Sequence, residues 1–388
     1  MFARVLKELL KRRKAPVAAP DAASLLQAGI QAEQEDRLED ALRCYQEAAS
    51  RFAAPALLHT KLGNLLRRLG RNTEAIVAYR EAVELEPAFA PAHNNLGVAL
   101  CAADEVDEAI GCFEHAIALG PSRAEVHENL GGVYFGRGRL ADSLACYREV
   151  LRTQPDNGNA LHMVATMTGG RPERAADQYV AKVFDGYAER FDAHLVGELE
   201  YSAPREIAAL IEQHLAEGAL LDVLDLGCGT GLAGAEFSGR ARQLVGVDLS
   251  RNMLEQARRK NLYTRLEESD LQGMMLGEAA ASYDLILAAD VFIYIGKLEG
   301  IVAEAKRLLR PGGMFGFSVE ALEGAQADYV LALTGRYAHA ANYLERLARD
   351  CGFRVLAAQS APIRKQTGLP VPGHLVLWQS PGAVGGGA

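Results

Sequence analysis

The sequence predicts two domains of different class: a helical repeat domain, followed by a doubly wound α/β sheet. Three observations support this prediction. The chain has 388 residues, whereas an ordinary domain has about 100–200 residues. The first half repeats its pattern of small and aromatic residues, which is typical of a solenoid. The second half alternates short apolar runs with helix-like segments, which is typical of a parallel sheet covered by helices.

Composition excludes several classes of protein. The net charge is −9, which opposes binding to the phosphate backbone of nucleic acids. The six cysteines are scattered and form no C-x-x-C pair, so we interpret them as reduced thiols and expect no metal site. No stretch approaches the roughly 20 apolar residues of a membrane span. We therefore expect a cytoplasmic protein.

Residues 1–21 form a basic N-terminal segment and linker. The stretch MFARVLKELLKRRK is dominated by lysine and arginine and places its apolar residues near helical spacing. Two interpretations stay open: a short helix that seeks an acidic surface, or a helix that frays or packs on the first repeat. A proline- and alanine-rich linker follows it.

The repeat unit is 34 residues long, because this is the spacing between Gly29, Gly63, Gly97 and Gly131. A small residue and then an aromatic residue follow each glycine at fixed distances, in the pairs Ala41 and Tyr45, Ala75 and Tyr79, Ala109 and Phe113, and Ser143 and Tyr147. Small residues let two helices approach, and the aromatic ring fills the gap between repeats. This pattern resembles the tetratricopeptide repeat. We assign residues 22–172 to this domain and expect the segment after Pro155 to cap its last repeat.

Repeats of this family stack into a concave groove, and the resemblance implies a peptide or protein partner. Asn95 and Asn129 occupy the same position of successive repeats. A ladder of side-chain amides there would bind a peptide backbone, so both residues are candidate substrate contacts. Asparagine is also common at this position in ordinary repeats, and a purely structural role stays open.

The α/β domain is predicted over residues 173–380, with a glycine-rich tail at 381–388. Its apolar runs include LLDVLDLG, RQLVGVDLS, YDLILAADVFIYI, MFGFSVE, GFRVLAA and HLVLWQ. In such sheets the ligand lies at the carboxyl ends of the strands, where the stretch VLDLGCGTGLAG places its glycines. Gly229, Gly231 and Gly234 also satisfy G-x-G-x-x-G, so the glycines alone leave a dinucleotide enzyme open.

The surrounding motifs resemble those of class I S-adenosylmethionine-dependent methyltransferases, whose Rossmann-like sheet ends in an antiparallel strand. DLGCGTG resembles their first motif, and GVDLS supplies an acid for the ribose. EESDL supplies an acid for the adenine, and YDLILAADVFIY is the fourth strand. Towards the end of the chain, the segments LTGRYAHAANYLERLARDCGFRV and IRKQTGLPVPGHLVLW resemble those of bacterial predicted methyltransferases with N-terminal tetratricopeptide repeats. The resemblance implies S-adenosylmethionine as cofactor, bound by Asp225, Gly227, Cys228, Gly229, Gly231, Asp248, Leu249, Met253, Asp270, Leu271 and Asp290.

The segment YVAKVFDGYAERFDAHLV precedes the sheet and resembles the aromatic and acidic stretch with which many small methyltransferases cover the cofactor. Phe184 and Tyr187 are its candidate cofactor contacts. Their helical spacing is equally compatible with ordinary packing.

Fewer motifs mark the residues that would bind the methyl acceptor. Arg336, Tyr337 and Arg364 are candidate substrate contacts near the carboxyl edge of the sheet. If the acceptor carries a proton, His339 is the first candidate base, followed by Asp290 and Tyr294. Three functions remain open: a methyltransferase for a peptide or protein bound by the repeats, a methyltransferase for a small metabolite with repeats used for assembly, and a non-catalytic scaffold.

Overall fold

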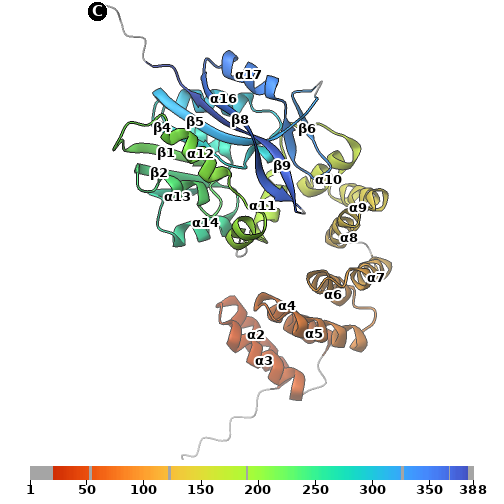
Figure 1. Cartoon of the computed structure of the whole chain (residues 1–388). Coiled ribbons are helices and arrows are strands. Elements are labelled where there is room, and N and C mark those ends of the chain that lie inside the picture. The colour runs from red at the N-terminus through yellow and green to blue at the C-terminus, as the bar shows by residue number, and fades with distance from the viewer. Residues whose placement is uncertain are drawn as a thin grey trace, which may run out of the picture. The chain divides into compact units, whose positions relative to one another are not determined.

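The computed structural model describes residues 21–51, 55–120, 124–188, 191–324, 327–366 and 368–382 (Figure 1). Most of the predicted basic segment and the last six residues of the predicted tail lie outside these ranges. The chain divides into two compact units, Met1–Pro155 and Asp156–Ala388. None of the described helices is long and apolar enough to cross a bilayer.

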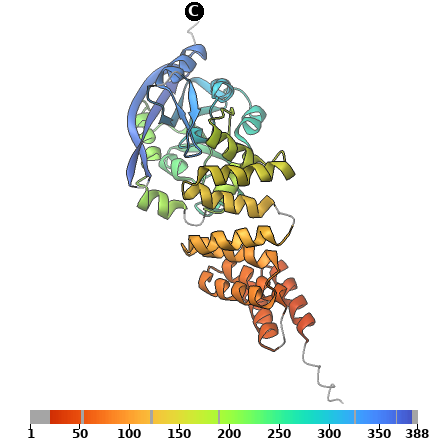
Figure 2. The same cartoon turned by 90° about the vertical axis from the view of Figure 1, so that its right-hand side faces the viewer.

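The first unit consists of helices that lie in successive pairs (Figure 2). The pairs are α2 (Ala22–Gln34) with α3 (Leu38–Arg51), α4 (Ala56–Arg68) with α5 (Asn72–Leu85), α6 (Ala90–Ala102) with α7 (Val106–Ala118), and α8 (Ala124–Gly136) with α9 (Leu140–Thr153). The predicted helical repeats are thus confirmed over the described residues.

The repeat glycines lie directly beneath the aromatic rings. A Cβ atom built on Gly63 would lie 2.5 Å from Cε1 of Tyr79, and one on Gly97 would lie 2.7 Å from Cε1 of Phe113. Both rings are almost fully buried. The glycine therefore lets the two helices of a pair approach closely enough for the ring of the second to fill the space.

The second unit is built on a mixed sheet with the strand order β3-β2-β1-β4-β5-β7-β6, in which β9 pairs with β5 and β8. Its strands are β1 (Leu221–Leu226), β2 (Ala241–Asp248), β3 (Arg265–Glu268), β4 (Tyr283–Ala288), β5 (Leu309–Ala321), β6 (Tyr329–Leu331), β7 (Tyr337–His339), β8 (Arg354–Gln366) and β9 (Leu369–Gln379). Strands β1 to β5 run parallel to their neighbours in the order β3, β2, β1, β4 and β5. The predicted antiparallel last strand is confirmed, because β9 runs opposite to β5 and to β8.

Alternate residues of the strands build a core on each face of the sheet. On one face Leu224, Ile286 and Phe315 pack with the helices α15 (Leu271–Gly277), α16 (Glu299–Leu308) and α17 (Ala341–Asp350). On the other face Val223 and Leu285 pack with α12 (Ala203–Glu212) and α13 (Leu232–Phe237). The remaining helices of this unit are α10 (Gly158–Thr168), α11 (Asp177–Asp185), the π-helix Ala193–Glu198, α14 (Arg251–Arg259) and the short 3-10 turn Phe292–Tyr294.

Helix α10 belongs to the second compact unit, whereas the sequence assigned residues 22–172 to the repeat domain. The ring of His162 accounts for part of this grouping. It stacks on Tyr179 with ring centroids 4.0 Å apart, and its Nε2 donates to the backbone oxygen of Gly335 at 2.9 Å. The compact units thus divide before this helix rather than after it.

Candidate functional site

A cavity of about 590 Å³ lies at the carboxyl edge of the sheet. Its lining includes the residues that follow β1, the end of β2, the start of α15 and the residues that follow β4. This is the edge at which parallel sheets bind ligands, and the volume falls within the roughly 300–1,000 Å³ of small-molecule sites. The predicted location of the site agrees with this geometry.

The glycine-rich turn after β1 has three glycines in left-handed conformations, with φ of 61° at Gly227, 53° at Gly229 and 91° at Gly231. Residues with a Cβ atom rarely adopt this region. A Cβ on Gly229 would meet no described atom closer than Cε1 of Phe191 at 3.9 Å. Gly227, Cys228 and Gly229 line the cavity, so the backbone of the turn is open to a ligand. Burial raises the pKa of the Cys228 thiol well above its ordinary value.

Asp248 ends β2 and lines the cavity together with Leu249. Its Oδ2 accepts a hydrogen bond from the backbone N–H of Gly229 at 2.9 Å, and its Oδ1 accepts one from that of Ser250 at 2.8 Å. Burial raises the pKa of Asp248, and these N–H donors oppose the rise. The acid is thus locked against the glycine-rich turn. Met253 is buried beneath it and is not among the lining residues.

Asp225 lies inside β1 rather than on the cavity wall. Tyr263 donates its hydroxyl proton to Oδ2 of Asp225 at 2.6 Å. Burial raises the pKa of Asp225 to about 7. Asp225 is buried, and neither it nor Gly231 of the turn is among the residues that line the cavity.

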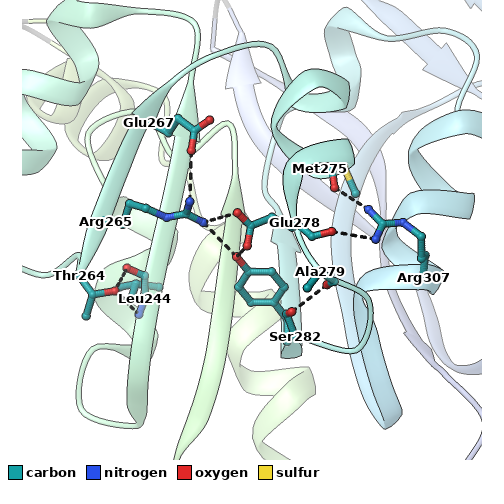
Figure 3. Close-up of polar contacts among 10 residues, drawn as sticks. Leu244, Thr264, Arg265, Glu267, Met275, Glu278, Ala279, Ser282 and Arg307 are labelled. Carbon is teal, nitrogen blue, oxygen red and sulfur yellow. Dashed lines mark hydrogen bonds and ion pairs between the residues drawn. The ribbon is translucent and has the colours of Figure 1, made fainter.

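Asp270 and Leu271 also line the cavity. Asp270 caps α15, since its Oδ1 accepts a hydrogen bond from the backbone N–H of Gly273 at 3.0 Å. Figure 3 shows how the opposite end of this helix is held: Arg307 donates to the backbone oxygens of Met275 at 2.7 Å and Glu278 at 2.8 Å. A cation at these carbonyls suits the helix dipole. Both ends of α15 are therefore fixed, which fixes Asp270 at the cavity.

Aromatic side chains line the cavity on the side of α11. Phe184, Tyr187 and Phe191 all contribute to the wall. The Phe184 ring meets Tyr294 edge-on with centroids 5.5 Å apart, and Tyr187 meets Phe191 in the same way at 5.3 Å. The Phe184 contact thus joins the predicted cover segment to the β4 side of the cavity.

A group of charged and phenolic side chains lines the cavity near the ends of β4 and β8. Asp290 adopts a left-handed conformation with φ of 60°, and its N–H donates to Ser318 Oγ at 2.8 Å. Arg364 donates to Asp290 Oδ1 at 2.5 Å and also to Glu320. Arg364 is almost fully buried, and among the described residues its Nε has no hydrogen-bond partner. Its guanidinium therefore holds the Asp290 carboxylate more than it faces a substrate.

Tyr294 and Arg336 complete this group on the cavity wall. Burial raises the pKa of Tyr294. Arg336 donates to Gln366 Oε1 at 2.9 Å and keeps about a quarter of its side chain exposed. It is thus the more accessible of the two arginines.

The structure does not bring His339 or Tyr337 into the cavity. Both are fully buried in β7 and neither belongs to the lining. His339 Nε2 donates to the backbone oxygen of Gly296 at 3.0 Å, and burial lowers its pKa to about 4. The expected base and substrate contact are therefore positioned as packing residues, because the insertion that carries them pairs with the end of β5.

Asn95 and Asn129 lie in the first unit, and their amides are engaged within it. Asn95 Nδ2 donates to Asn64 Oδ1 at 2.9 Å, and Asn129 Nδ2 donates to Asn94 Oδ1 at 3.0 Å. Amides of successive repeats are thus connected, because these donors bind the side-chain oxygens of Asn64 and Asn94.

Sequence reasoning missed several residues of the site. Tyr201 and Thr230 line the cavity, and Tyr263 orders the turn through Asp225. Because Thr230 lies between two glycines of the turn, its position could have marked it as a site residue. No local pattern marks Tyr263, whose partner lies 38 residues away.

Comparison with known proteins agrees with this geometry. A family model described as a methyltransferase domain matches residues 223–313. Models described as TPR repeat and tetratricopeptide repeat match residues 63–104 and 88–156.

Two curated relatives are O-methyltransferases. The chain is 28% identical over 185 residues to malonyl-acyl-carrier protein O-methyltransferase of Enterobacter lignolyticus, covering 47% of this chain and 70% of that protein. It is 28% identical over 151 residues to ubiquinone biosynthesis O-methyltransferase of Thiobacillus denitrificans, covering 38% of this chain and 63% of that protein.

Among solved structures, one similar chain is the 1,6-didemethyltoxoflavin-N1-methyltransferase of Burkholderia thailandensis, crystallised with 1,6-didemethyltoxoflavin and S-adenosylhomocysteine. It is 21% identical, with a TM-score of 0.43, and the match covers 54% of this chain and 92% of that one.

Proposed function

The chain carries tetratricopeptide repeats followed by a methyltransferase domain of the S-adenosylmethionine-dependent class, and we propose that its cavity binds S-adenosylmethionine and transfers the methyl group to an acceptor oxygen, nitrogen or carbon. The observation that carries the proposal is the hydrogen bond that joins the glycine-rich turn to Asp248. It combines an open backbone with a buried acid at the cavity wall. A ribose diol needs an acid of this kind, and charged hydrogen bonds contribute about 1.5–3 kcal/mol each.

The residues at the cavity fit the parts of this cofactor. The turn Gly227–Gly229 would hold the methionine portion through its backbone, and Asp248 would accept hydrogen bonds from the ribose. Asp270 and Leu271 would contact the adenine. When bound, S-adenosylmethionine supplies an electrophilic methyl group, so the protein mainly has to orient the acceptor and exclude water. Orientation of this kind lowers a barrier by about 7–11 kcal/mol.

The group at the ends of β4 and β8 would orient the acceptor. Asp290 has its Oδ1 bound by Arg364, which keeps the carboxylate fixed beside Tyr294. An acceptor that arrives protonated would donate to the second carboxylate oxygen of Asp290. His339 takes no part in this proposal, because it is buried outside the cavity.

We further propose that the repeats bind a peptide or protein, which is either the acceptor or a partner that delivers it. Tetratricopeptide repeats are the feature that supports a protein partner. Since Asn95 and Asn129 each already donate one N–H within the repeats, a peptide would meet the second N–H of each amide. A cytoplasmic location stays a prediction.

A second candidate is O-methylation of a small molecule, with the repeats used for assembly. The name of one relative, ubiquinone biosynthesis O-methyltransferase, favours it, and so does a cavity volume in the range of small-molecule sites.

One labelling experiment separates these candidates. Full-length protein is incubated with tritiated S-adenosylmethionine and a bacterial extract, which is then split into macromolecules and small molecules. Label in a protein band supports the peptide or protein acceptor, and label confined to the small-molecule fraction supports the second candidate. Asp248→Ala serves as the control, since it should abolish both. No transfer above this control in either fraction would contradict both candidates.

A further inference from the structure

The segment over the cavity carries two carboxylates that do not line it. Phe184 and Phe191 contribute to the cavity wall, whereas their neighbours Asp185 and Asp192 do not. Each aspartate instead accepts a hydrogen bond from a side chain that lies close to a residue which the proposed function assigns to the cofactor.

Asp185 ends α11 and contacts the start of α14. Ser250 donates its hydroxyl proton to Asp185 Oδ1 at 2.6 Å, and Asn252 Nδ2 donates to the backbone oxygen of Asp185 at 3.0 Å. Ser250 is fully buried, and its backbone N–H donates to Asp248 Oδ1 at 2.8 Å. This contact therefore ends at Ser250, two residues from the ribose-binding candidate and hydrogen-bonded to it.

Asp192 follows Phe191 and contacts the glycine-rich turn. Thr230 donates its hydroxyl proton to Asp192 Oδ1, and Lys260 Nζ donates to Oδ2 at 2.6 Å. Thr230 is almost fully buried and lines the cavity beside Gly229. Lys260 lies at the C-terminal end of α14. This second contact therefore joins the segment to the turn that would hold the methionine portion.

The two contacts flank the aromatic residues that face the cavity. Tyr187 and Phe191 both lie between the two aspartates in the sequence. Fixing both aspartates therefore fixes the positions from which these rings contact a ligand. Lys260 contributes a full charge to the second contact, whereas Ser250 contributes only a hydroxyl. The side chains of Asp192 and Lys260 are 42% and 30% exposed, so salt should screen this pair.

We propose that Asp185 and Asp192 are latches that hold the cover segment closed over bound S-adenosylmethionine, with Lys260 setting the strength of the second latch. The inference rests on the proposed function. Asp185, Asp192 and Lys260 are positioning residues: they act on the cofactor through the aromatic rings and through the turn. Weakening a latch should speed release of the cofactor while its association stays unchanged, because the binding surface itself is intact.

The test measures association and dissociation of tritiated S-adenosylmethionine by rapid dilution and filter binding, using the full chain. Asp192→Asn keeps an acceptor for Thr230 but removes the charge, and Lys260→Met removes the same charge pair from the other side. Each should raise the dissociation rate about fivefold at low salt, near the upper range for a half-exposed ion pair. The double variant should release no faster than either single variant. In the wild type alone, 0.5 M NaCl should speed release to a similar extent.

Asp328→Asn is the matched control, because Asp328 forms a comparable exposed pair with Arg346 at 2.7 Å and is not a lining residue. Its release rate should equal that of the wild type. If the wild type binds the cofactor but both latch variants release it at the wild-type rate, the latch proposal is overturned and the proposed function stands. If the folded wild type does not bind the cofactor at all, the proposed function fails, and the latch with it.

Discussion

The two units treat buried polar groups in opposite ways. Among the described residues, the first unit buries only the neutral polar side chains Thr60, Asn94 and Ser143 and the imidazole of His93, whose pKa burial lowers. The second unit buries carboxylates and a guanidinium, namely Asp222, Asp225, Asp248, Glu320 and Arg364. Burying a charge is costly unless it is paired or hydrogen-bonded. The second unit therefore holds buried charges in hydrogen-bonded positions, and two of these residues, Asp248 and Arg364, line the cavity.

Glycine gives the same lesson. In the repeats, Gly63 and Gly97 make room for an aromatic ring of the protein itself. In the turn, Gly229 has a left-handed backbone and faces open space. The first use supports stability alone, and the second supports access of a ligand to the backbone.

The largest predicted effect that tests this comparison is the pH dependence that Asp225 contributes to the free energy of unfolding. The folded chain keeps this proton up to a pKa of about 7, whereas an unperturbed aspartate has 3.8. The unfolded chain loses the proton first, so the free energy of unfolding should fall as pH rises from about 4 to about 7. At about 1.4 kcal/mol per pKa unit, the contribution is about 4 kcal/mol at most. Asp225→Asn should remove this slope.

Urea unfolding at a series of pH values between 4 and 8 measures this slope. The fluorescence of Trp378, the sole tryptophan, which lies in β9, reports the unfolding. Asp222→Asn is the control. Hydrogen bonds from Arg242 lower the pKa of Asp222, so its contribution is lost only below about pH 4, and Asp222→Asn should lower stability without changing the slope between pH 4 and 8. A slope that is identical in the wild type and in Asp225→Asn would contradict the account of Asp225.

The next largest effect concerns packing in the repeats. Gly63→Ala would bring a Cβ atom to 2.5 Å from the buried Tyr79 ring, and overpacking of this kind costs about 1–3 kcal/mol. Unfolding followed by circular dichroism should therefore shift to lower urea.

Gly111→Ala is the control, since this glycine lies in α7 with no atom within 4 Å of the added Cβ. It should gain up to about 1 kcal/mol from helix propensity. Equal stability of the two variants would argue against the packing role of the repeat glycines.

The third effect concerns Gly229, the glycine of the turn that lines the cavity. Gly229→Ala should lose about 1–2 kcal/mol of stability, because its φ of 53° is left-handed. It should also bind S-adenosylmethionine about tenfold more weakly, since the added methyl group enters the cavity.

Gly312→Ala separates these two consequences. Gly312 has a φ of 84°, with no atom within 4 Å of the added Cβ, and it does not line the cavity. Calorimetric titration should find its cofactor affinity unchanged. An equal loss of affinity in both variants would attribute the effect to backbone strain alone.

The smallest effect concerns Ser143, which stands where three other repeats have alanine. Ser143 Oγ is buried and donates to the backbone oxygen of Gly131 at 2.8 Å. Ser143→Ala should cost about 1 kcal/mol or less and leave cofactor affinity unchanged. Ser238→Ala removes a similar but exposed hydroxyl contact and should cost less still. A larger loss in Ser238→Ala would contradict the ranking by burial.

Patterns that repeat along the chain could be predicted from the sequence. The register of the repeats follows from glycine and aromatic positions, and the glycine-rich turn follows from its motif, because both are local. Contacts between distant side chains could not be predicted. Asp225 binds Tyr263, and Asp192 binds Lys260, across long stretches of sequence that no period relates.

His339 illustrates the same limit on the predicted site. A histidine between alanines gave no sign of whether it faced the cavity or the core. Its burial follows from the pairing of β7 with the end of β5, which no local pattern specifies. Asp248, in contrast, could be located because it ends a strongly apolar strand directly before a helix cap.

The most direct test of the central claim is a calorimetric titration of the folded chain with S-adenosylmethionine, beside Asp248→Ala and Asp328→Asn. We predict micromolar binding by the wild type and by Asp328→Asn, and a loss of at least a hundredfold in Asp248→Ala, which is about 2.7 kcal/mol. Equal binding by all three proteins would contradict the assignment of Asp248 to the ribose. No binding by the folded wild type would contradict the cofactor site itself.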